Sequence, residues 1–344
     1  MQPAVPATAP GTSSPVAGSR GIHRAQSLVL TVAVLTYRRV DQLRDNLSVV
    51  CSHVAALCEQ EMAVSASVLV VDNDPAASAR SIVEERFPSA CYVVEPRAGI
   101  SAARNRAIHE AGSSDLLVFI DDDERPRSTW LLPLIETWQA SGATAVPGRV
   151  VPHFESPPER WILDGHFFDR PERASGTRMR SVAAGNLLLD LRQLRASGIT
   201  FEEPFGATGG EDSLLGQRLA KAGHEIVWCA ESVVEDLVPT ERLTKRWVLQ
   251  RAYSQGNLQA LIDCHLADGW LTGLAARARR AAAAMWYITR GSAGTTRGYV
   301  IADQSRQAIG LRTAYRGLGM LSGLMGRAYT QYARTDALDS SGDS

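Results

Sequence analysis

The sequence has little of what marks secreted, membrane-spanning and nucleic-acid-binding proteins. Its five cysteines are odd in number and include no C-x-x-C pair, which supports neither a disulfide framework nor a zinc site. Residues 1–26 lack the apolar core of a signal peptide, and no run approaches the roughly 18 apolar residues of a transmembrane helix. A formal net charge of -1 argues against nucleic-acid binding, which needs a basic face. We therefore expect a cytoplasmic protein with free thiols and at most a peripheral contact with the inner face of a membrane.

Charge is unevenly distributed along the chain. Residues 241–335 contain 14 Arg and Lys against 4 Asp and Glu, a balance of +10, so the remainder carries -11. The length of 344 residues is enough for one large α/β domain with a helical appendage. We expect a disordered Pro- and Ala-rich arm at 1–26, a catalytic domain at 27–240, a basic helical region at 241–335 and a polar tail at 336–344.

Strand and helix patterns alternate in the first part of the body. Unbroken apolar runs predict strands and apolar residues at helical spacing predict helices. The expected strands are 28–35, 67–71, 91–94 and 116–120, and the expected helices are 41–60 and 101–111. This order predicts a mainly parallel sheet with helices on both faces, and ligands of such sheets bind beyond the carboxyl ends of the strands.

The chain after residue 127 combines further strands and helices. We expect a helix to about residue 140, strands at 144–150 and 181–190, and a helix from 213 to 222. From residue 240 onward the pattern is helical and basic.

Three adjacent aspartates, Asp121-Asp122-Asp123, follow the fourth predicted strand. So many like charges repel one another or raise each other's pKa unless a cation neutralises them. Hard carboxylate oxygens suit Mg²⁺ or Mn²⁺, which take the rest of their ligands from water and substrate phosphates. The alternative is a solvated acidic turn in which one aspartate caps the next helix.

A second acidic motif, Gly209-Gly210-Glu211-Asp212, immediately precedes the helix predicted at 213–222. Glycines let the backbone approach a ligand closely, and a carboxylate here can accept a proton from an attacking hydroxyl. The alternative is that both acids only complement the dipole of the helix N-terminus.

Taken together and in this order, these motifs resemble the family 2 glycosyltransferases, above all the bacterial enzymes of exopolysaccharide and cell-envelope synthesis. The resemblance covers about residues 28–255. The resembling segments are LTVAVLTYRR at 30–39, VLVVDND at 68–74, AGISAARNRAI at 98–108, LLVFIDDDE at 116–124, AAGNLLL at 183–189 and GGEDSLLGQRL at 209–219. It implies a GT-A fold, that is, one nucleotide-sugar-binding α/β domain with a mainly parallel central sheet flanked by helices, here with a C-terminal helical extension.

The resemblance also implies an activity, the transfer of one sugar with inversion from a nucleotide-diphosphate sugar, preferably UDP-linked, to a hydroxyl of a glycan or lipid-linked acceptor. Asp121 and Asp123 match the family's D-x-D and would bind Mn²⁺ or Mg²⁺, with Asp121 also leaning toward the ribose. Asp212 would be the catalytic base, and Glu211 would help to hold the acceptor.

The remaining roles implied by the resemblance concern the two substrates. The residues expected near the nucleotide sugar, besides Asp121, are Thr36, Tyr37, Asp72, Arg104, Asn105 and Asp122. The residues expected on the acceptor side are Gly185, Asn186 and Gly210.

The sequence departs from the family pattern in two places. Many relatives have a His shortly after the base as a metal or diphosphate ligand, but the corresponding stretch here, 233–242, has Glu235 and Asp236. The Q-x-x-R-W motif of processive synthases is absent, because Leu243 stands where the Gln would precede Arg246-Trp247. We therefore expect one sugar to be added, and either Glu235 or Asp236 to be a candidate metal ligand.

The segment 270–290 is an amphipathic helix by its spacing. Its apolar half is formed by Trp270, Leu271, Leu274, Ala278, Ala282, Met285 and Trp286, and its other half carries Arg277, Arg279, Arg280 and Arg290. This pattern is typical of a helix lying on an anionic membrane surface. The alternative is a helix packed on the catalytic domain with its arginines in water.

Other functions fit the sequence less well. A haloacid dehalogenase needs Thr or Val in D-x-D-x-[TV], where this chain has Arg125, and a dinucleotide-binding enzyme needs a G-x-G-x-x-G that is missing. Two alternatives stay open, namely an inactive nucleotide-sugar-binding scaffold and a tailoring glycosyltransferase acting on a soluble small molecule.

Overall fold

A computed structural model describes residues 28–60, 64–170, 172–267 and 269–329. The arm predicted at 1–26 and the tail predicted at 336–344 lie outside the described residues.

Four parallel strands form the first half of the sheet. Strand β1 (Leu28–Thr36) lies between β2 (Val64–Asp72) and β4 (Leu116–Asp121), and β3 (Cys91–Val94) pairs with the outer side of β2. In the register of these pairs Thr36 lies opposite Asp72, and Leu35 opposite Asp121. The polar residues that follow three different strands therefore meet at one edge of the sheet.

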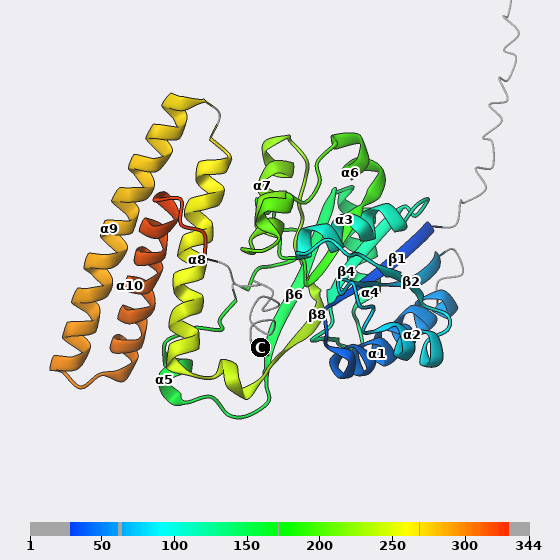
Figure 1. Ribbon diagram of the computed structural model, residues 1–344, viewed down its shortest axis with the longest axis horizontal. Coiled ribbons are helices and arrows are strands. Elements are labelled where there is room, and N and C mark those ends of the chain that lie inside the picture. Colours follow the sequence, from blue (N-terminus) through cyan, green and yellow to red (C-terminus); the bar gives the residue numbers. More distant parts are fainter. Residues whose placement is uncertain (1–27, 61–63, 171, 268, 330–344) are drawn as a thin grey trace, which may run out of the picture.

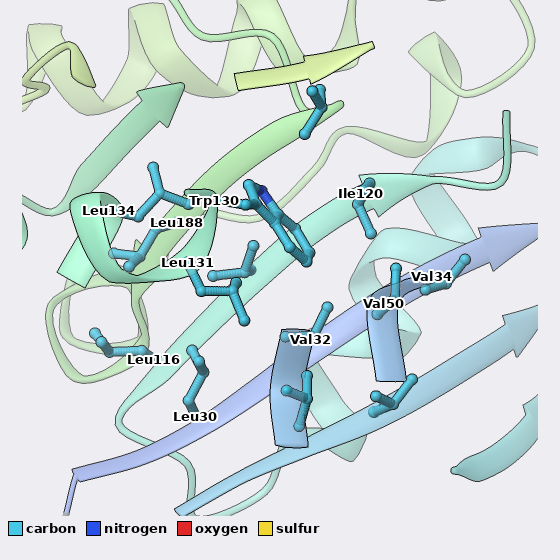
Figure 2. Packing of buried hydrophobic residues seen from close by; sticks show 14 of the residues in the cluster. Leu30, Val32, Val34, Val50, Leu116, Ile120, Trp130, Leu131, Leu134 and Leu188 are labelled. Atoms are coloured by element: carbon cyan, nitrogen blue, oxygen red, sulfur yellow. The ribbon is translucent and has the colours of Figure 1, made fainter. Parts of the chain in front are cut away.

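Helices cover both faces of this half, as the β-α-β order predicts. The helices are α1 (Val40–Gln60), α2 (Arg80–Arg86) and α3 (Ile100–Glu110), while α4 (Leu131–Ser141) packs against α1 and against strands of the second half of the sheet. Alternate residues of β1 enter two separate cores, because successive side chains of a strand point to opposite faces. Leu30, Val32 and Val34 pack with α1, α4 and the fully enclosed Trp130, whereas Ala33 and Leu35 pack toward α3. Figure 2 shows the first of these cores around Trp130.

The second half of the sheet is mixed. Strand β7 (Asn186–Asp190) runs antiparallel to β4, and β6 (Ala145–Phe154) runs antiparallel to β7. Strand β8 (Cys229–Val238) is parallel to β6, and the short β5 (Glu124–Pro126) closes the order β3-β2-β1-β4-β7-β6-β8-β5. The predicted fold class is confirmed, with a sheet that is parallel in its first half and mixed in its second.

One predicted strand is too long. The strand expected at 181–190 begins only at Asn186, and residues 181–185 run as irregular backbone. Part of this backbone is pressed against α7 (Glu211–Lys221), where Gly216 is so close to Ser181 and Val182 that a side chain would collide with them. Packing against a helix thus replaces strand pairing. Two short helices, α5 (Arg160–Asp164) and α6 (Leu191–Ser197), complete the body.

Three long helices follow the sheet, namely α8 (Lys245–His265), α9 (Trp270–Val300) and α10 (Gln304–Leu324). In Figure 1, α8 stands next to the α/β body, and α9 lies on the outer side of the molecule. Helix α10 packs against both of the others, through glycines at which a Cβ would collide with the neighbouring backbone. Among the helices of the described residues, none combines the length and apolarity needed to cross a bilayer.

Candidate active site

The end of β4 carries the acidic cluster of the site. Asp121 and Asp123 are partly exposed at the edge of the sheet, with 34% and 19% of their side-chain surfaces accessible. Burial and the negative charges of Asp123, Asp236 and Asp212 raise the pKa of Asp121 to about 6, although Arg104 acts in the opposite direction. Carboxylates from the end of β4, from β8 and from α7 therefore lie close to one another, and for β8 the sequence left open whether Glu235 or Asp236 would take part.

Asp122 is buried and joins two strand ends. Its carboxylate accepts a hydrogen bond from Thr36 Oγ1 at 2.8 Å and one from Arg39 Nη1 at 3.0 Å. Thr36 and Asp122 are both buried, and burial raises the pKa of Asp122 to about 6. These two residues, expected beside the nucleotide, use their polar atoms on each other and so fix the ends of β1 and β4.

Two arginines reach Asp123. Arg39 Nη1 lies 3.0 Å from its carboxylate, and Arg242 Nη2 lies 3.7 Å away, from the short turn of 3-10 helix Thr240–Arg242 that follows β8. Neither arginine was assigned to the site from the sequence. Arg39 stands in the polar cluster that follows β1, but no spacing links Arg242 to residue 123.

Asp236 and Glu235 lie on opposite faces of β8, because neighbouring residues of a strand alternate. Asp236 accepts a hydrogen bond from Arg170 Nη2 at 2.7 Å, and its charge reaches Asp121. Glu235 instead accepts one from Arg127 Nε at 2.9 Å. Of the two candidates left open by the sequence, Asp236 is the one that faces the aspartate cluster.

The chemistry of this cluster fits a hard divalent cation. Asp121 and Asp123 offer carboxylate oxygens beyond the strand end, and oxygen ligands of this kind are those that Mg²⁺ and Mn²⁺ prefer. Within the described ranges no three metal-ligating side chains are already arranged as a closed cage. The protein would thus supply about two ligands, and water and a substrate diphosphate would supply the others.

Arg104 connects the two acidic motifs. This buried residue of α3 forms an ion pair with Glu211 at the start of α7, and its Nη2 lies 3.7 Å from Asp121 Oδ1. The second oxygen of Glu211, Oε2, is buried and has no hydrogen-bond partner among the described residues. An arginine expected only near the nucleotide therefore lies between the D-x-D carboxylates and the residue next to the expected base.

Asn105, the next residue of α3, has a different role from the one expected. Its side-chain amide donates to the carbonyl of Phe201 at 2.8 Å and accepts from the backbone N–H of Phe201 at 3.0 Å. Both ends of the amide are thus bound to the main chain at residue 201, so Asn105 holds that segment, and its contact with a nucleotide stays a prediction.

Glu124 is a buried acid that the sequence did not mark as a site residue. Its Oε2 accepts a hydrogen bond from the backbone N–H of Asp121 at 3.1 Å, and burial together with the charge of Asp121 raises its pKa well above the usual range. Gly185 lies directly against this carboxyl, where any side chain would collide with it. The glycine expected to line the acceptor side is therefore also needed to make room for Glu124.

Asp212 lies at the N-terminus of α7 and is half-buried. Its Oδ1 accepts from the backbone N–H of Ser213 at 2.5 Å, and its Oδ2 accepts from that of Ala184 at 3.3 Å. Gly210 precedes the helix with φ +83°, a left-handed conformation that favours glycine. Two backbone bonds fix the direction of the carboxylate, and its charge is felt by Asp121 across the site.

Two residues expected to contact substrates are fully buried. Asp72 accepts hydrogen bonds from the backbone of Asp74 and Ala79 and from the hydroxyl of Tyr92, at 2.7–3.0 Å. It therefore shapes the loop after β2 and exposes no oxygen to a nucleotide.

Asn186 is enclosed in the same way. Its amide donates to the carbonyl of Ser232 at 3.1 Å and accepts from Trp130 Nε1 at 3.0 Å. The expectation that Asn186 lines the acceptor site is corrected by this burial, because it ties β7 to β8 inside the sheet.

The surface beside the nucleotide edge is formed by other groups. Tyr37 is half-buried, and the guanidinium of Arg38 lies 5.1 Å from the centre of its ring. Asn73 donates to the carbonyls of Glu95 and Arg97 and accepts from the N–H of Gly99, which fixes the loop between β3 and α3. Only Tyr37 of this set was expected near the nucleotide.

Comparison with known proteins gives the family. A family model described as Glycosyl transferase family 2 matches residues 31–192. The succinoglycan biosynthesis protein ExoM of Rhizobium meliloti (strain 1021) is 32% identical over 249 residues, which are 71% of this chain and 78% of that protein.

Solved structures are similar in fold. The mannosyltransferase PcManGT from Pyrobaculum calidifontis, determined with GDP-Man and Mn²⁺, has a TM-score of 0.54 at 17% identity, with 87% of each chain covered. GalNAc-T7, determined with UDP, GalNAc and Mn²⁺, has a TM-score of 0.49 at 11% identity over 70% of this chain and 52% of its own, so this chain spans about half of it. The likeness to PcManGT shows the GT-A-like fold and nothing finer.

Proposed function

Since the chain belongs to the family 2 glycosyltransferases and is thus a glycosyltransferase with a GT-A-like fold, we propose that it transfers one sugar, with inversion, from a nucleotide-diphosphate sugar to a hydroxyl of a growing glycan. The resemblance of the chain's sequence motifs to those of the family indicates a UDP-linked donor. A divalent cation, Mn²⁺ or Mg²⁺, assists the transfer.

The observation that carries this proposal is the junction made by Arg104. This buried arginine pairs with Glu211, the neighbour of the expected base, and approaches Asp121 of the D-x-D motif, so it connects the two acidic motifs. A transferase needs the leaving diphosphate on one side of the anomeric carbon and the base on the other. Asp121 at the end of β4 and Asp123 in the turn after it would supply the first side, and Asp212 on α7 the second.

On the donor side, Asp121 and Asp123 would hold the divalent cation. When bound, the cation stabilises the negative charge that develops on the departing diphosphate. Arg39 and Arg242 reach Asp123 and are close enough to this edge to contact phosphate oxygens as well. Tyr37 offers a ring surface to the base of the nucleotide, whereas Thr36, Asp72, Asn105 and Asp122 act by holding the loops and strand ends around it.

On the acceptor side, Asp212 accepts the proton of the attacking hydroxyl. The hydroxyl oxygen then forms a bond to the anomeric carbon while the bond from that carbon to the diphosphate oxygen breaks, and the nucleoside diphosphate leaves with the electron pair. The N–H groups of Ser213 and Ala184 orient Asp212 for this step. Glu211, held by Arg104, and the backbone at Gly210 border the acceptor.

The acceptor that fits best is a lipid-linked glycan of bacterial exopolysaccharide or envelope synthesis at the cytoplasmic face of a membrane. ExoM is named for succinoglycan biosynthesis, and it is 32% identical to this chain. The absence of Q-x-x-R-W from the sequence further favours the addition of one sugar over processive polymerisation.

The experiment that tests this function is donor hydrolysis across a panel of UDP-, GDP- and dTDP-sugars, each with Mn²⁺, with Mg²⁺ and with a chelator. We expect release of UDP from one UDP-sugar, only with a divalent cation. Turnover of a GDP- or dTDP-sugar would show that the donor is not UDP-linked, and turnover in the presence of chelator would show that no metal is needed. If a folded protein turned over none of the donors, the inactive scaffold would be favoured.

A further inference from the structure

The outer face of α9 carries large apolar side chains that the described part of the chain leaves uncovered. Trp270 and Trp286 expose 77% and 55% of their surfaces, and the helix lies on the outer side of the molecule (Figure 1). The other large apolar residues of α9 that are more than half exposed are Leu271, Leu274, Met285, Tyr299 and Val300. At about 100° per residue most of these positions share one side of the helix, so they form a stripe along its whole length. We call these seven residues the α9 stripe.

The inner face of α9 has the opposite composition. Its buried residues are all small, namely Ala276, Ala284, Gly291 and Gly298. Gly291 and Gly298 lie so close to α10 that a Cβ would collide with it. A helix that packs in water hides its large apolar side chains and exposes polar ones, whereas small residues at helix contacts and large apolar residues outside are typical of helices in contact with lipid.

The charges around the α9 stripe have one sign. Residues 270–324 contain eight arginines and one acidic residue, Asp303, which lies between the two helices. Arg279, Arg290 and Arg297 are exposed and fall on one edge of the stripe at helical spacing. Arg290 also lies over the ring of Trp286, 5.2 Å from its centre. Arg280, expected among the exposed arginines, instead pairs with Asp263 of α8 and is mostly covered.

We propose that the α9 stripe lies in the interface of an anionic phospholipid bilayer, with the helix parallel to the membrane plane. Apolar area and Trp rings enter the boundary between headgroups and acyl chains, while Arg279, Arg290 and Arg297 contact anionic headgroups. A helix of 31 residues is about 46 Å long, and its apolar residues occur at both ends, so the whole length can rest on the surface. A second copy of the chain is the poorer partner, because it would bring two arginine-rich helices together.

This surface is joined to the site by direct packing of helices. Helix α10 packs against both α9 and α8, and Gly210, which precedes Asp212, lies against Leu258 and Ile262 of α8. A membrane on the α9 stripe would therefore hold the site at a set distance and angle from the bilayer. The inference concerns binding alone and does not depend on the proposed transfer reaction.

The test is flotation of the full chain with vesicles of phosphatidylcholine, or of phosphatidylcholine mixed with phosphatidylglycerol, at low and high salt and without donor. We expect binding to the anionic vesicles that weakens in salt. Changing Arg279, Arg290 and Arg297 to Gln should weaken it about a hundredfold. The matched control changes Arg86, Arg192 and Arg195, three exposed arginines of the body, to Gln, and should bind like the unchanged chain.

A second variant set tests the apolar half of the proposal. Trp270→Ser with Trp286→Ser should also abolish flotation, and these exposed residues can change without unfolding the chain. Brominated lipid should quench Trp fluorescence in the unchanged chain and not in the variant Trp270→Phe with Trp286→Phe. Three outcomes would each overturn the proposal. The chain binds no vesicle, the body control loses binding as much as the α9 variant does, or sedimentation equilibrium shows a dimer that Trp286→Ser dissociates. Donor hydrolysis is measured for the same Arg and Trp variants without vesicles. A variant that hydrolyses donor but no longer binds vesicles has lost membrane binding and not the proposed transfer activity.

Discussion

The α/β body and the α8–α10 extension are built on opposite packing rules. In the body large aromatic side chains are fully buried, with Trp130, Phe119 and Phe201 inside the cores. In the extension the buried residues of α9 are glycine and alanine, and its Trp270 and Trp286 are exposed. The body is held by burial of apolar area, whereas the extension gains its contacts from close approach of backbones. The comparison shows that apolar content alone does not reveal which side of a helix is inside.

The proposed catalytic residues all lie in the body and none lies on α9 or α10, so the largest expected effect on activity comes from a change in the body. Asp212→Asn keeps the shape and hydrogen bonding of the side chain but cannot accept a proton, so kcat should fall by about 10²–10⁴ with little change in donor affinity. The control is Asp303→Asn in the extension, where Asn can still cap α10 as Asp303 does through the N–H of Arg306. Steady-state kinetics of both variants check this, and a wild-type rate for Asp212→Asn would reduce Asp212 to a helix-start residue.

The metal-binding role belongs to the body as well. Asp123→Ala removes one of the two carboxylates proposed to hold the cation and leaves Arg39 and Arg242 facing a gap. We expect kcat to fall by about 10²–10³, with the stabilisation of the fold by Mn²⁺ lost. Thermal unfolding with and without Mn²⁺ measures the second effect independently of turnover. Full activity in Asp123→Ala, or in a chelator, would contradict a metal held there.

One residue type tests the packing contrast directly. Trp130→Ala empties a fully buried position and should lower the free energy of unfolding by about 3–5 kcal/mol. Trp270→Ala changes an exposed position and should alter it by less than about 0.5 kcal/mol. Denaturant unfolding followed by far-UV circular dichroism compares them. Equal losses would mean that the stripe on α9 is covered after all.

Glycine substitutions test whether the helices of the extension are in close backbone contact. A Cβ at Gly256 would collide with the backbone of Arg316, so Gly256→Ala should destabilise the fold by about 1–3 kcal/mol. Gly294 has ordinary space around it, so Gly294→Ala should instead stabilise α9 by about 0.5–1 kcal/mol. The two variants make the same chemical change with opposite predicted signs. A stabilising Gly256→Ala would show that α8 and α10 are not in close backbone contact.

The smallest expected effect is a pH dependence confined to the body. The pKa values of Asp121 and Asp122 rise from 3.8 in the unfolded chain to about 6 in the fold. Because the pKa values are higher in the fold, the protonated carboxyls contribute fully to the free energy of unfolding below about pH 3.8. This contribution is lost as the pH rises from there to about 6. Cation binding needs the ionised carboxylates, so Mn²⁺ should raise the unfolding temperature more at about pH 7 than at about pH 5. Arginines do not titrate in this range, so vesicle binding through the α9 stripe should be the same at both values.

Much of the fold follows from local patterns. The unbroken apolar run of β1, the helical spacing of α1 and the short runs of β3 and β4 predicted these elements nearly to the residue. Side-chain period depends only on the backbone geometry of each element, so it is visible in one sequence. The strand expected at 181–190 failed in its first half because contact with α7, made by residues about 30 positions later, replaced strand pairing.

The site was predictable where the chemistry lies in adjacent residues. The sequence by itself determined the two acidic motifs and their order, because three aspartates at a strand end and Glu-Asp after two glycines are local signals. Only the tertiary structure decided which partners these groups have. Asp72 and Asn186 have polar side chains like those of ligand contacts, yet both are enclosed by hydrogen bonds from distant elements.

Conversely, Arg242 and Asp236 reach the aspartates of β4 from β8 and its following turn, and Glu124 is enclosed through Gly185. The exposure of the α9 stripe was likewise decided by the close packing of α10 on the opposite side. The physical reason is the same in each case. The period and charge of a segment are properties of the segment, whereas burial, hydrogen-bond partners and pKa depend on what the rest of the chain brings to it.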